Sequence, residues 1–382
     1  MRIFVVSNGY PSKRSPQWGC FERDQAEALA ALNHEVVMIS YDRRFRWFWR
    51  KLGITTIQRN NVTSINIFLV PNKIIRLLGK GFYQWFKHWQ IDYVYKRAVK
   101  LFGNPDVLYS HFLPVTSNAI FLKQKYGIPL VAMEHWSEIV KENIRPGFLR
   151  MGQDTYPHVD KLLSVSPVLQ NHLINKFNVQ SEVVYNIVGR EFDYDPSVQP
   201  NETFTIVSVG SLIHLKRLDI AIEAFNIVHK HVPSQLLIIG EGPELHNIKT
   251  QIFKLGLGDS VKLMGRKNKT EIAHLYHRSH VLLLSSELET FSVVCIEAMA
   301  CGLPVVATRC GGPESFVRQE NGILCSINDV SGMAEALLSV INNYNQYNHK
   351  EIADNCQSCF GAYTIAHQLT QIFEETIKHF NK

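Results

Sequence analysis

Two glutamates, Glu289 and Glu297, flank the expected start of a short helix, with seven residues between them. We expect an apolar strand at 281–285 and a helix at about 292–301. The helix should stop at Gly302, because glycine commonly follows the last helical residue. This order of strand, loop and helix is typical of a site that binds an anion.

The amide groups that open this helix indicate which anion it would hold. The N–H groups of Phe291, Ser292 and Val293 should carry the positive end of the helix dipole, roughly +0.5 of a charge. A diphosphate suits such a terminus. Glu297 lies roughly 7–8 Å further along at about 1.5 Å per residue, where the hydroxyl pair of a ribose would follow a bound pyrophosphate.

The two glutamates also have a plain structural interpretation, as a helix cap and a solvated helix face. However, Glu289, seven residues, Glu297 and then AMACGLPVV resembles the hallmark of the family 4 retaining glycosyltransferases. The resemblance implies an α/β chain of the GT-B class, with two doubly wound Rossmann-like domains facing a central cleft. It also implies a nucleotide-diphosphate sugar as donor, with UDP favoured over GDP as the nucleotide, and no metal ion or other cofactor. In that reading Glu289 positions the sugar and Glu297 the ribose.

A basic loop follows the strand expected at 204–209 and ends in Lys216 and Arg217. Loops at the carboxyl end of such a strand bind ligands, so we expect both side chains to take the charge of the leaving diphosphate. The family usually has an arginine directly after the glycine of this loop, whereas this chain has Ser211 after Gly210. The alternative is a solvated basic turn before the next helix.

Three further turns follow strands of the second half. The turn at 240–243 lacks the third glycine of a dinucleotide fingerprint, and it resembles a Gly-x-Gly-Pro turn of the family. The resemblance implies that the backbone at Gly265 and Arg266 reads the nucleobase. The turn at 311–312 matches a family element, and a plain turn explains it nearly as well.

The first half offers a glycine and two histidines at expected strand ends. Gly19 lies in the loop after the first strand, which could approach the diphosphate or the acceptor. His111 and His135 each follow an apolar strand, and both could instead be core residues. The family has a histidine at each place, the second often next to the transferred sugar, so His135 joins Glu289 and Lys216 as a candidate catalytic residue.

Apolar strands alternate with amphipathic helices along the whole chain, which predicts parallel sheets covered on both faces. In the first half we expect strands at 3–7, 35–40, 65–70, 107–110, 130–133, 161–164 and 182–185, and long helices at 21–32 and 85–101. In the second half we expect strands at 204–209, 235–239, 261–264, 281–285, 304–307 and 322–325.

This alternation predicts an acceptor-binding domain at 1–190 and a donor-binding domain at 202–362, joined through a polar stretch at 192–201 that contains two prolines. By resemblance, the last helix at about 363–382 packs back on the first domain. Asp193 and Asp195 resemble the metal-binding pair of another glycosyltransferase fold. They lie in the expected linker and not at a buried strand end, so we predict no metal site there.

The chain of 382 residues is 46% hydrophobic, enough for two cored domains, and it has no run of 18 apolar residues. Its first seven residues predict a buried strand and lack the features of a signal peptide, so we expect a cytoplasmic protein. The seven cysteines are scattered without CxxC spacing, which argues against a disulfide or zinc framework.

Charge is concentrated in the first half, where residues 1–195 hold 25 Lys and Arg against 16 Asp and Glu, while the remainder holds 15 against 18. The stretch 43–89 has ten basic residues, no acidic residue and four of the six tryptophans. One interpretation is a solvated basic face with apolar residues packed inward, namely Leu78, Phe82, Trp85, Phe86 and Trp89.

The other interpretation of 43–89 is docking on an anionic membrane beside a lipid-linked acceptor, which would make the protein peripheral on the inner face of a membrane. The sequence contains no RNA-binding or helix-turn-helix module, so we do not expect a nucleic-acid partner. The acceptor would be a glycan or a lipid-linked glycan.

Two other functions remain open for a chain of this kind. A sugar-nucleotide epimerase has the same two-domain fold and would need no acceptor. A partner subunit that has lost turnover is a further alternative, and Ser211 at the usual arginine position is its best support. A nicotinamide dehydrogenase is disfavoured because no G-x-G-x-x-G follows the first expected strand.

Overall fold

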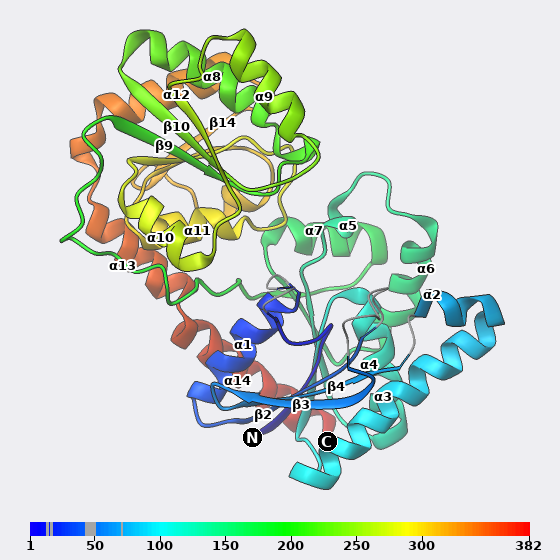
Figure 1. Cartoon of the computed structure of the whole chain (residues 1–382). Coiled ribbons are helices and arrows are strands. Elements are labelled where there is room, and N and C mark those ends of the chain that lie inside the picture. Colours follow the sequence, from blue (N-terminus) through cyan, green and yellow to red (C-terminus); the bar gives the residue numbers. More distant parts are fainter. Residues whose placement is uncertain (13–14, 16–17, 43–50, 70–71) are drawn as a thin grey trace. The chain divides into compact units, whose positions relative to one another are not determined.

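A computed structural model describes residues 1–12, 15, 18–42, 51–69 and 72–382 of the chain. It forms two compact units (Figure 1). Unit 1 comprises residues 1–187 and 362–382, and unit 2 comprises residues 188–361. Unit 2 begins before the expected linker at 192–201, because Phe192 is fully buried with its ring 5.9 Å from that of Tyr276.

Unit 1 is built on an eight-stranded sheet in the order β3-β4-β2-β1-β5-β6-β7-β8. Its strands are β1 (Arg2–Val6), β2 (Glu35–Tyr41), β3 (Gly53–Arg59), β4 (Val62–Phe68), β5 (Val107–His111), β6 (Leu130–Glu134), β7 (Lys161–Ser164) and β8 (Glu182–Val183). The central strands are runs of buried apolar residues, as a sheet covered on both faces requires.

The expectation of purely parallel sheets is wrong at one edge of unit 1. Strand β3 was not expected, and it pairs antiparallel with β4. The two strands are joined at Asn60 and Asn61, whose φ angles of 47° and 61° belong to a tight two-residue hairpin. Because β3 is an edge strand whose second half is exposed, it lacks the apolar run that announces the other strands.

Eight helices of the described chain belong to unit 1: α1 (Cys20–Ala31), α2 (Asn72–Ile75), α3 (Lys80–Phe102), α4 (Leu113–Tyr126), α5 (Ser137–Val140), α6 (Pro146–Thr155), α7 (Pro167–Phe177) and α14 (Ala362–Phe380). The last helix, α14, packs against α1, and its Phe373 lies 5.0 Å from the ring of Tyr109. Helix α14 is therefore part of the same unit as α1.

Unit 2 has a six-stranded, fully parallel sheet in the order β11-β10-β9-β12-β13-β14. Its strands are β9 (Phe204–Val209), β10 (Ser234–Ile239), β11 (Val261–Gly265), β12 (Val281–Leu284), β13 (Val305–Thr308) and β14 (Gly322–Cys325). Its helices are α8 (Leu218–His231), α9 (Leu245–Lys254), α10 (Lys269–His277), α11 (Val293–Ala300), α12 (Val330–Asn342) and α13 (His349–Phe360).

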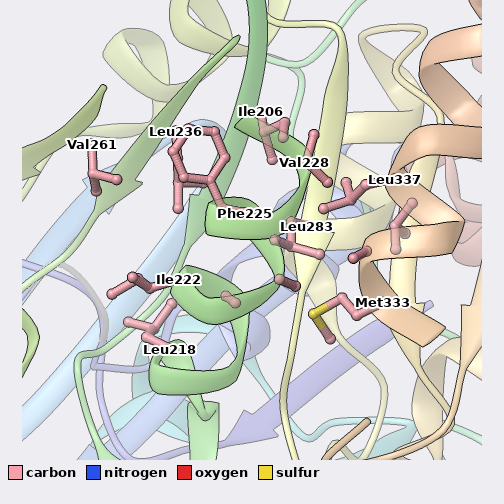
Figure 2. Close-up of a cluster of buried hydrophobic side chains, with 14 of the residues drawn as sticks. Ile206, Leu218, Ile222, Phe225, Val228, Leu236, Val261, Leu283, Met333 and Leu337 are labelled. Carbon is pink, nitrogen blue, oxygen red and sulfur yellow. The ribbon is translucent and has the colours of Figure 1, made fainter. Parts of the chain in front are cut away.

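The core of unit 2 lies between this sheet and α8 with α12 (Figure 2). Phe225 of α8, Leu283 of β12 and Leu337 of α12 are all fully buried in it. A side chain of this size contributes roughly 1.5–3 kcal/mol when it is fully buried. This packing fixes the sheet, and the loops that leave its carboxyl edge are fixed with it.

Gly19 lies directly before α1, with φ at +76°. A Cβ atom at this position would lie 1.8 Å from the carbonyl oxygen of Gly9. The close approach of two loop segments therefore requires glycine at position 19 whether or not a ligand binds there, and the expected role at the diphosphate or acceptor stays a prediction.

We predict that Gly19→Ala destabilises the protein by about 2–5 kcal/mol, because a left-handed φ costs roughly 1–2 kcal/mol and overpacking adds roughly 1–3 kcal/mol. Gly127→Ala is the matched control, because Gly127 has a φ of +64° and nothing within 4 Å of an added Cβ. Urea unfolding of both variants measures the difference. Equal stability of the two variants would show that the contact with Gly9 is unimportant.

Candidate active site

The loop that carries Glu289 is fixed by a neighbouring turn. The Glu289 N–H donates to the Cys310 carbonyl at 2.8 Å, and the Gly312 N–H donates to the Glu289 carbonyl at 2.9 Å. A Cβ atom at Gly312 would lie 2.3 Å from the backbone of Phe291. The glycine turn at 311–312 therefore has a clear structural task, which is to hold the Glu289 loop in place.

Lys216 and Glu289, which are far apart in the sequence, form an ion pair in unit 2. Their side chains are 22% and 13% exposed. The Ser286 hydroxyl donates to the same Glu289 oxygen at 2.8 Å, and the Ser285 hydroxyl donates to the Lys216 carbonyl at 2.7 Å. The structure thus brings together two of the three residues predicted to be catalytic, and it holds them at the carboxyl edge of the sheet.

Helix α11 starts at Val293, one residue later than expected (Figure 1). Ser292 precedes it in a left-handed conformation with φ at 77°, and no side chain caps the helix. The first-turn amides of a helix have no partner within that helix, so the N–H groups of Val293 and Val294 lie at its positive end. The backbone here has the geometry expected of an anion site.

Phe291 and Glu297 lie on either side of this helix start. The Phe291 ring is buried, with the rings of Phe316 and Phe360 at 5.4 Å and 5.7 Å. It therefore anchors the backbone that enters α11. Glu297 is 7% exposed. Burial of Tyr276, together with the negative charge of Glu297, raises the pKa of the Tyr276 hydroxyl, so this hydroxyl stays protonated.

Arg217 does not share the surroundings of Lys216. Its guanidinium donates to Asp219 at 2.8 Å, to Glu287 at 2.7 Å and to the side-chain oxygen of Asn328. These contacts, the Asp219 hydrogen bond first, raise its pKa. Through these contacts the Arg217 side chain ties neighbouring loops together, and its expected part in holding the diphosphate charge stays a prediction.

The loop at Gly210 and Ser211 lies against Lys216. A cavity of about 10 Å³ is lined there by Gly210, Ser211, Lys216, Ser285 and Ser286, among others. This is about the volume that one water needs. Lys216 and the loop therefore leave little free space here, and a ligand larger than a water would have to displace side chains that line this cavity.

Gly265 and Arg266 lie at the end of β11. Gly265 has a φ of +64° and nothing within 4 Å of an added Cβ, so the backbone conformation alone favours glycine there. Its carbonyl accepts from the Gly240 N–H at 2.9 Å, and Arg266 is exposed. Both residues are at the carboxyl edge of the sheet that carries Lys216, which is compatible with the expected contact to a base.

His135 and His111, which the sequence placed on separate strands of unit 1, are in direct contact. His135 Nε2 lies 3.0 Å from His111 Nδ1. The His135 ring stacks on that of Phe21 at 5.5 Å and lies 5.0 Å from that of Phe112. Burial lowers the pKa of His135 to about 3, so the ring is neutral.

Glu134 was missed by sequence reasoning. Its buried carboxylate accepts from the N–H groups of Leu113, His135 and Trp136 at 2.8, 3.0 and 2.9 Å, and from the Tyr156 hydroxyl at 2.8 Å. Burial raises its pKa, and these donors oppose the rise. Glu134 therefore fixes the loop that carries His135. A carboxylate at the end of an apolar strand was the signal that could have found it.

Among the described residues, no three of His, Cys, Asp and Glu come together in a way that could hold a metal ion. The Asp195 carboxylate accepts from the backbone and hydroxyl of Ser197 at 2.9 and 2.6 Å, in the manner of a turn.

The two Rossmann-like units have the architecture of the GT-B fold class. Solved structures of this class match almost the whole chain. Sucrose-phosphate synthase from Thermosynechococcus elongatus has a TM-score of 0.77 at 18% identity, covering 99% of both chains. Anabaena Alr3699/HepE in complex with UDP has a TM-score of 0.75 at 18% identity, covering 98% of this chain and 99% of that one.

Sequence comparison is more specific than the fold. The family model for glycosyl transferases group 1 matches residues 189–355, and that for glycosyltransferase family 4 matches residues 23–192. N-acetyl-alpha-D-glucosaminyl L-malate synthase of Bacillus anthracis is 31% identical over 252 residues. That alignment covers 62% of this chain and 66% of the relative, slightly under two thirds of its length. The chain belongs to the family 4, group 1 glycosyltransferases.

Proposed function

We propose that this glycosyltransferase moves a sugar from a nucleotide-diphosphate sugar to a glycan or lipid-linked acceptor with retention of anomeric configuration. UDP is favoured over GDP as the nucleotide of the donor. The observation that carries the proposal is the Lys216–Glu289 ion pair at the edge of the sheet from which α11 starts. One structural relative is described in complex with UDP-glucose, which supports a donor of this kind.

The ion pair gives the departing diphosphate a partner. In the transfer, the bond from the sugar's anomeric carbon to the diphosphate breaks, and the acceptor oxygen forms a bond to that carbon while its hydroxyl passes a proton to the departing diphosphate. Negative charge grows on the diphosphate, so Lys216 exchanges Glu289 for a phosphate oxygen, and the amides of Val293 and Val294 take the remainder. No metal ion takes part in this scheme.

The other candidate residues have supporting parts in the proposal. Glu289, once released by Lys216, accepts hydrogen bonds from hydroxyls of the sugar, and Glu297 accepts from the ribose. Gly265 and Arg266 contact the base. His135 contributes a neutral imidazole to the transferred sugar, since burial keeps its pKa at about 3. The expected contacts of Arg217 with the diphosphate, and of Gly19 with the diphosphate or acceptor, stay predictions.

The two alternatives differ from this proposal in a measurable way. An epimerase would convert the nucleotide sugar without any acceptor, so product from donor alone would favour it. A partner subunit without turnover would bind donor and release no nucleoside diphosphate under any condition. The intact Lys216–Glu289 pair favours an active enzyme over that subunit, although Ser211 occupies the usual arginine position.

A second part of the proposal concerns an exposed aromatic face on α3. Phe82, Trp85 and Trp89 repeat at helical spacing, and they are 43%, 57% and 40% exposed. Their rings continue through Phe86 to Tyr93 in steps of 5.4–6.3 Å. The interpretation that these side chains pack inward is therefore wrong for Phe82, Trp85 and Trp89.

Leu78 lies before the helix and is 64% exposed, so the interpretation that its side chain packs inward is wrong as well. Arg76 and Lys80, close to it in sequence, are exposed too, whereas Lys87 is buried with its ammonium group 5.1 Å from the Tyr83 ring centroid. The basic residues at 43–50 lie outside the described residues. Within the described residues, no helix is long and apolar enough to cross a bilayer.

We infer that this face docks on an anionic bilayer and brings the enzyme to a lipid-linked acceptor at the cytoplasmic side of a membrane. Tryptophan and tyrosine rings favour the headgroup level, and each well-placed Lys or Arg adds about 1 kcal/mol. The lack of any acidic residue between Asp42 and Asp92 supports an anionic partner over a basic one.

We predict that Lys216→Ala lowers turnover on the order of a hundred- to a thousandfold, as the loss of one charge-stabilising donor does. Release of nucleoside diphosphate from the donor and acceptor measures this. Lys249→Ala, which removes an exposed lysine of α9, is the control and should retain turnover. A Lys216→Ala enzyme as active as the control would exclude Lys216 from the reaction.

Nucleoside diphosphates should stabilise the protein against heat according to their affinity. At a hundred times its dissociation constant a ligand adds about 2.7 kcal/mol to the stability of the folded state. We expect UDP to give the largest shift in melting temperature and GDP a smaller one. If neither changes the melting temperature at millimolar concentration, the donor assignment is wrong.

Vesicle binding tests the membrane part of the proposal. We expect the protein to bind vesicles rich in anionic lipid at low salt and to detach as salt rises. Trp85→Ala combined with Trp89→Ala should weaken binding at least about tenfold, because each ring contributes roughly 1 kcal/mol or more when buried. Phe253→Ala, which removes an exposed aromatic side chain of α9 in unit 2, is the control and should leave vesicle binding unchanged. Absence of binding at low salt would refute this part.

A further inference from the structure

One arginine of unit 2 connects three loops that leave the carboxyl edge of the parallel sheet. Arg217 lies at the end of the loop between β9 and α8, and its Nη1 donates to Glu287 Oε1 at 2.7 Å and to Asn328 Oδ1. Glu287 belongs to the loop between β12 and α11, and Asn328 belongs to the loop between β14 and α12. We call these three residues the Arg217 bridge. The side chain of Arg217 is 16% exposed.

The guanidinium of the bridge is oriented by a carboxylate of its own segment. Arg217 Nη2 donates to Asp219 Oδ2 at 2.8 Å, and Arg217 Nε donates to Asp219 Oδ1 at 3.0 Å. Two such bonds to one carboxylate fix the plane of a guanidinium and leave its Nη1 group for other partners. Here those partners are Glu287 and Asn328. The planar fork of arginine makes all these contacts together, and the compact ammonium group of a lysine does not reproduce them.

Two residues of the bridge have a left-handed backbone. The φ angle is 44° at Arg217 and 61° at Asn328. Asparagine adopts this region more readily than other residues with side chains, whereas arginine has no such preference. Backbone of this kind persists where the surrounding structure determines it, and it gathers at functional sites. The side-chain contacts of Arg217 therefore give a reason for an arginine at a position whose backbone favours glycine.

The bridge is adjacent to the Lys216–Glu289 ion pair on two of its loops. Lys216 directly precedes Arg217, and Glu287 is two residues before Glu289. The backbones of the same two loops are also joined, because the Glu287 N–H donates to the Leu215 carbonyl at 2.9 Å. A shift of one loop against the other would therefore change the spacing between the Lys216 ammonium group and the Glu289 carboxylate.

We propose that Arg217 is a positioning residue, which acts through Glu287 and Asn328 to hold the loops of Lys216 and Glu289 at the spacing that the reaction needs. The coupling of these loops is a property of unit 2 alone, and its effect on turnover rests on the proposed function. A misplacement of a reacting group by about 1 Å can lower a rate about a hundredfold. Loss of the bridge should therefore lower kcat more than it lowers the affinity for UDP.

Hydrogen exchange of the full-length protein tests the coupling without reference to activity. The Glu287 amide is bonded to the Leu215 carbonyl, so it exchanges when the two loops separate. Arg217→Gly removes the side chain and keeps the left-handed backbone. We expect Arg217→Gly and Glu287→Ala to speed exchange in peptides over 285–290 about tenfold or more. Glu287→Gln should not, because its amide oxygen still accepts from Arg217. Unchanged exchange in Arg217→Gly would refute the coupling.

Turnover of the same variants tests whether the bridge serves the reaction. We expect Arg217→Gly and Glu287→Ala each to lower kcat on the order of tenfold to a hundredfold, with the affinity for UDP changed by no more than a few fold. The double variant should lose no more than either single variant, because both remove the same contact. Glu287→Gln should keep kcat within a few fold of the unchanged protein. Glu335→Ala, which removes an exposed carboxylate of α12, is the control.

A direct contact of Arg217 with the diphosphate would give a different pattern. Arg217→Gly would then weaken UDP binding strongly while Glu287→Ala kept its kcat, and this result would overturn the proposal. Equal loss of kcat in Glu287→Ala and Glu287→Gln would overturn it as well, and this pair carries the test if Arg217→Gly does not fold. Faster exchange in variants of a protein that transfers no sugar would refute the proposed function and leave the coupling of the loops intact.

Discussion

The ion pair of Lys216 with Glu289 is the interaction on which the proposed donor site depends. Both side chains are mostly buried, and both are held through their backbones by serine and glycine residues of neighbouring loops. Breaking a buried pair by removing one partner leaves an uncompensated charge, which is strongly unfavourable. In the proposed reaction, an incoming diphosphate avoids that cost because it replaces the Glu289 carboxylate with another anion.

The two units handle charge in opposite ways. Unit 2 places a lysine and the positive end of α11 at one sheet edge, which suits a departing anion. Unit 1 places a neutral histidine pair at its own sheet edge, and its Glu134 carboxylate accepts from backbone N–H groups and from the Tyr156 hydroxyl. Neutral donors suit sugar hydroxyls, which carry no charge. This difference between the units follows from burial, because an unpaired charge would be unstable at the buried position of His135.

The sequence predicted most central strands to within a residue or two, because each is a short apolar run with turn residues on both sides. It failed at β3, whose exposed edge position leaves no such run. It also could not separate Lys216 from Arg217, because the carboxylate that selects each cation arrives from a distant loop. Helical spacing placed Trp85 and Trp89 on one face but could not tell whether that face is covered. The contact between His111 and His135 depends on the pairing of β5 with β6, and the residues of these strands do not predict which strands pair.

The most direct test of the account is a crystal structure of the full chain with UDP. We expect a β-phosphate oxygen within about 2.7–3.2 Å of Lys216 Nζ and of an amide of Val293 or Val294, with Glu289 released from the lysine. A diphosphate bound at Arg217 or elsewhere, with the Lys216–Glu289 pair intact and the start of α11 covered by protein, would contradict it.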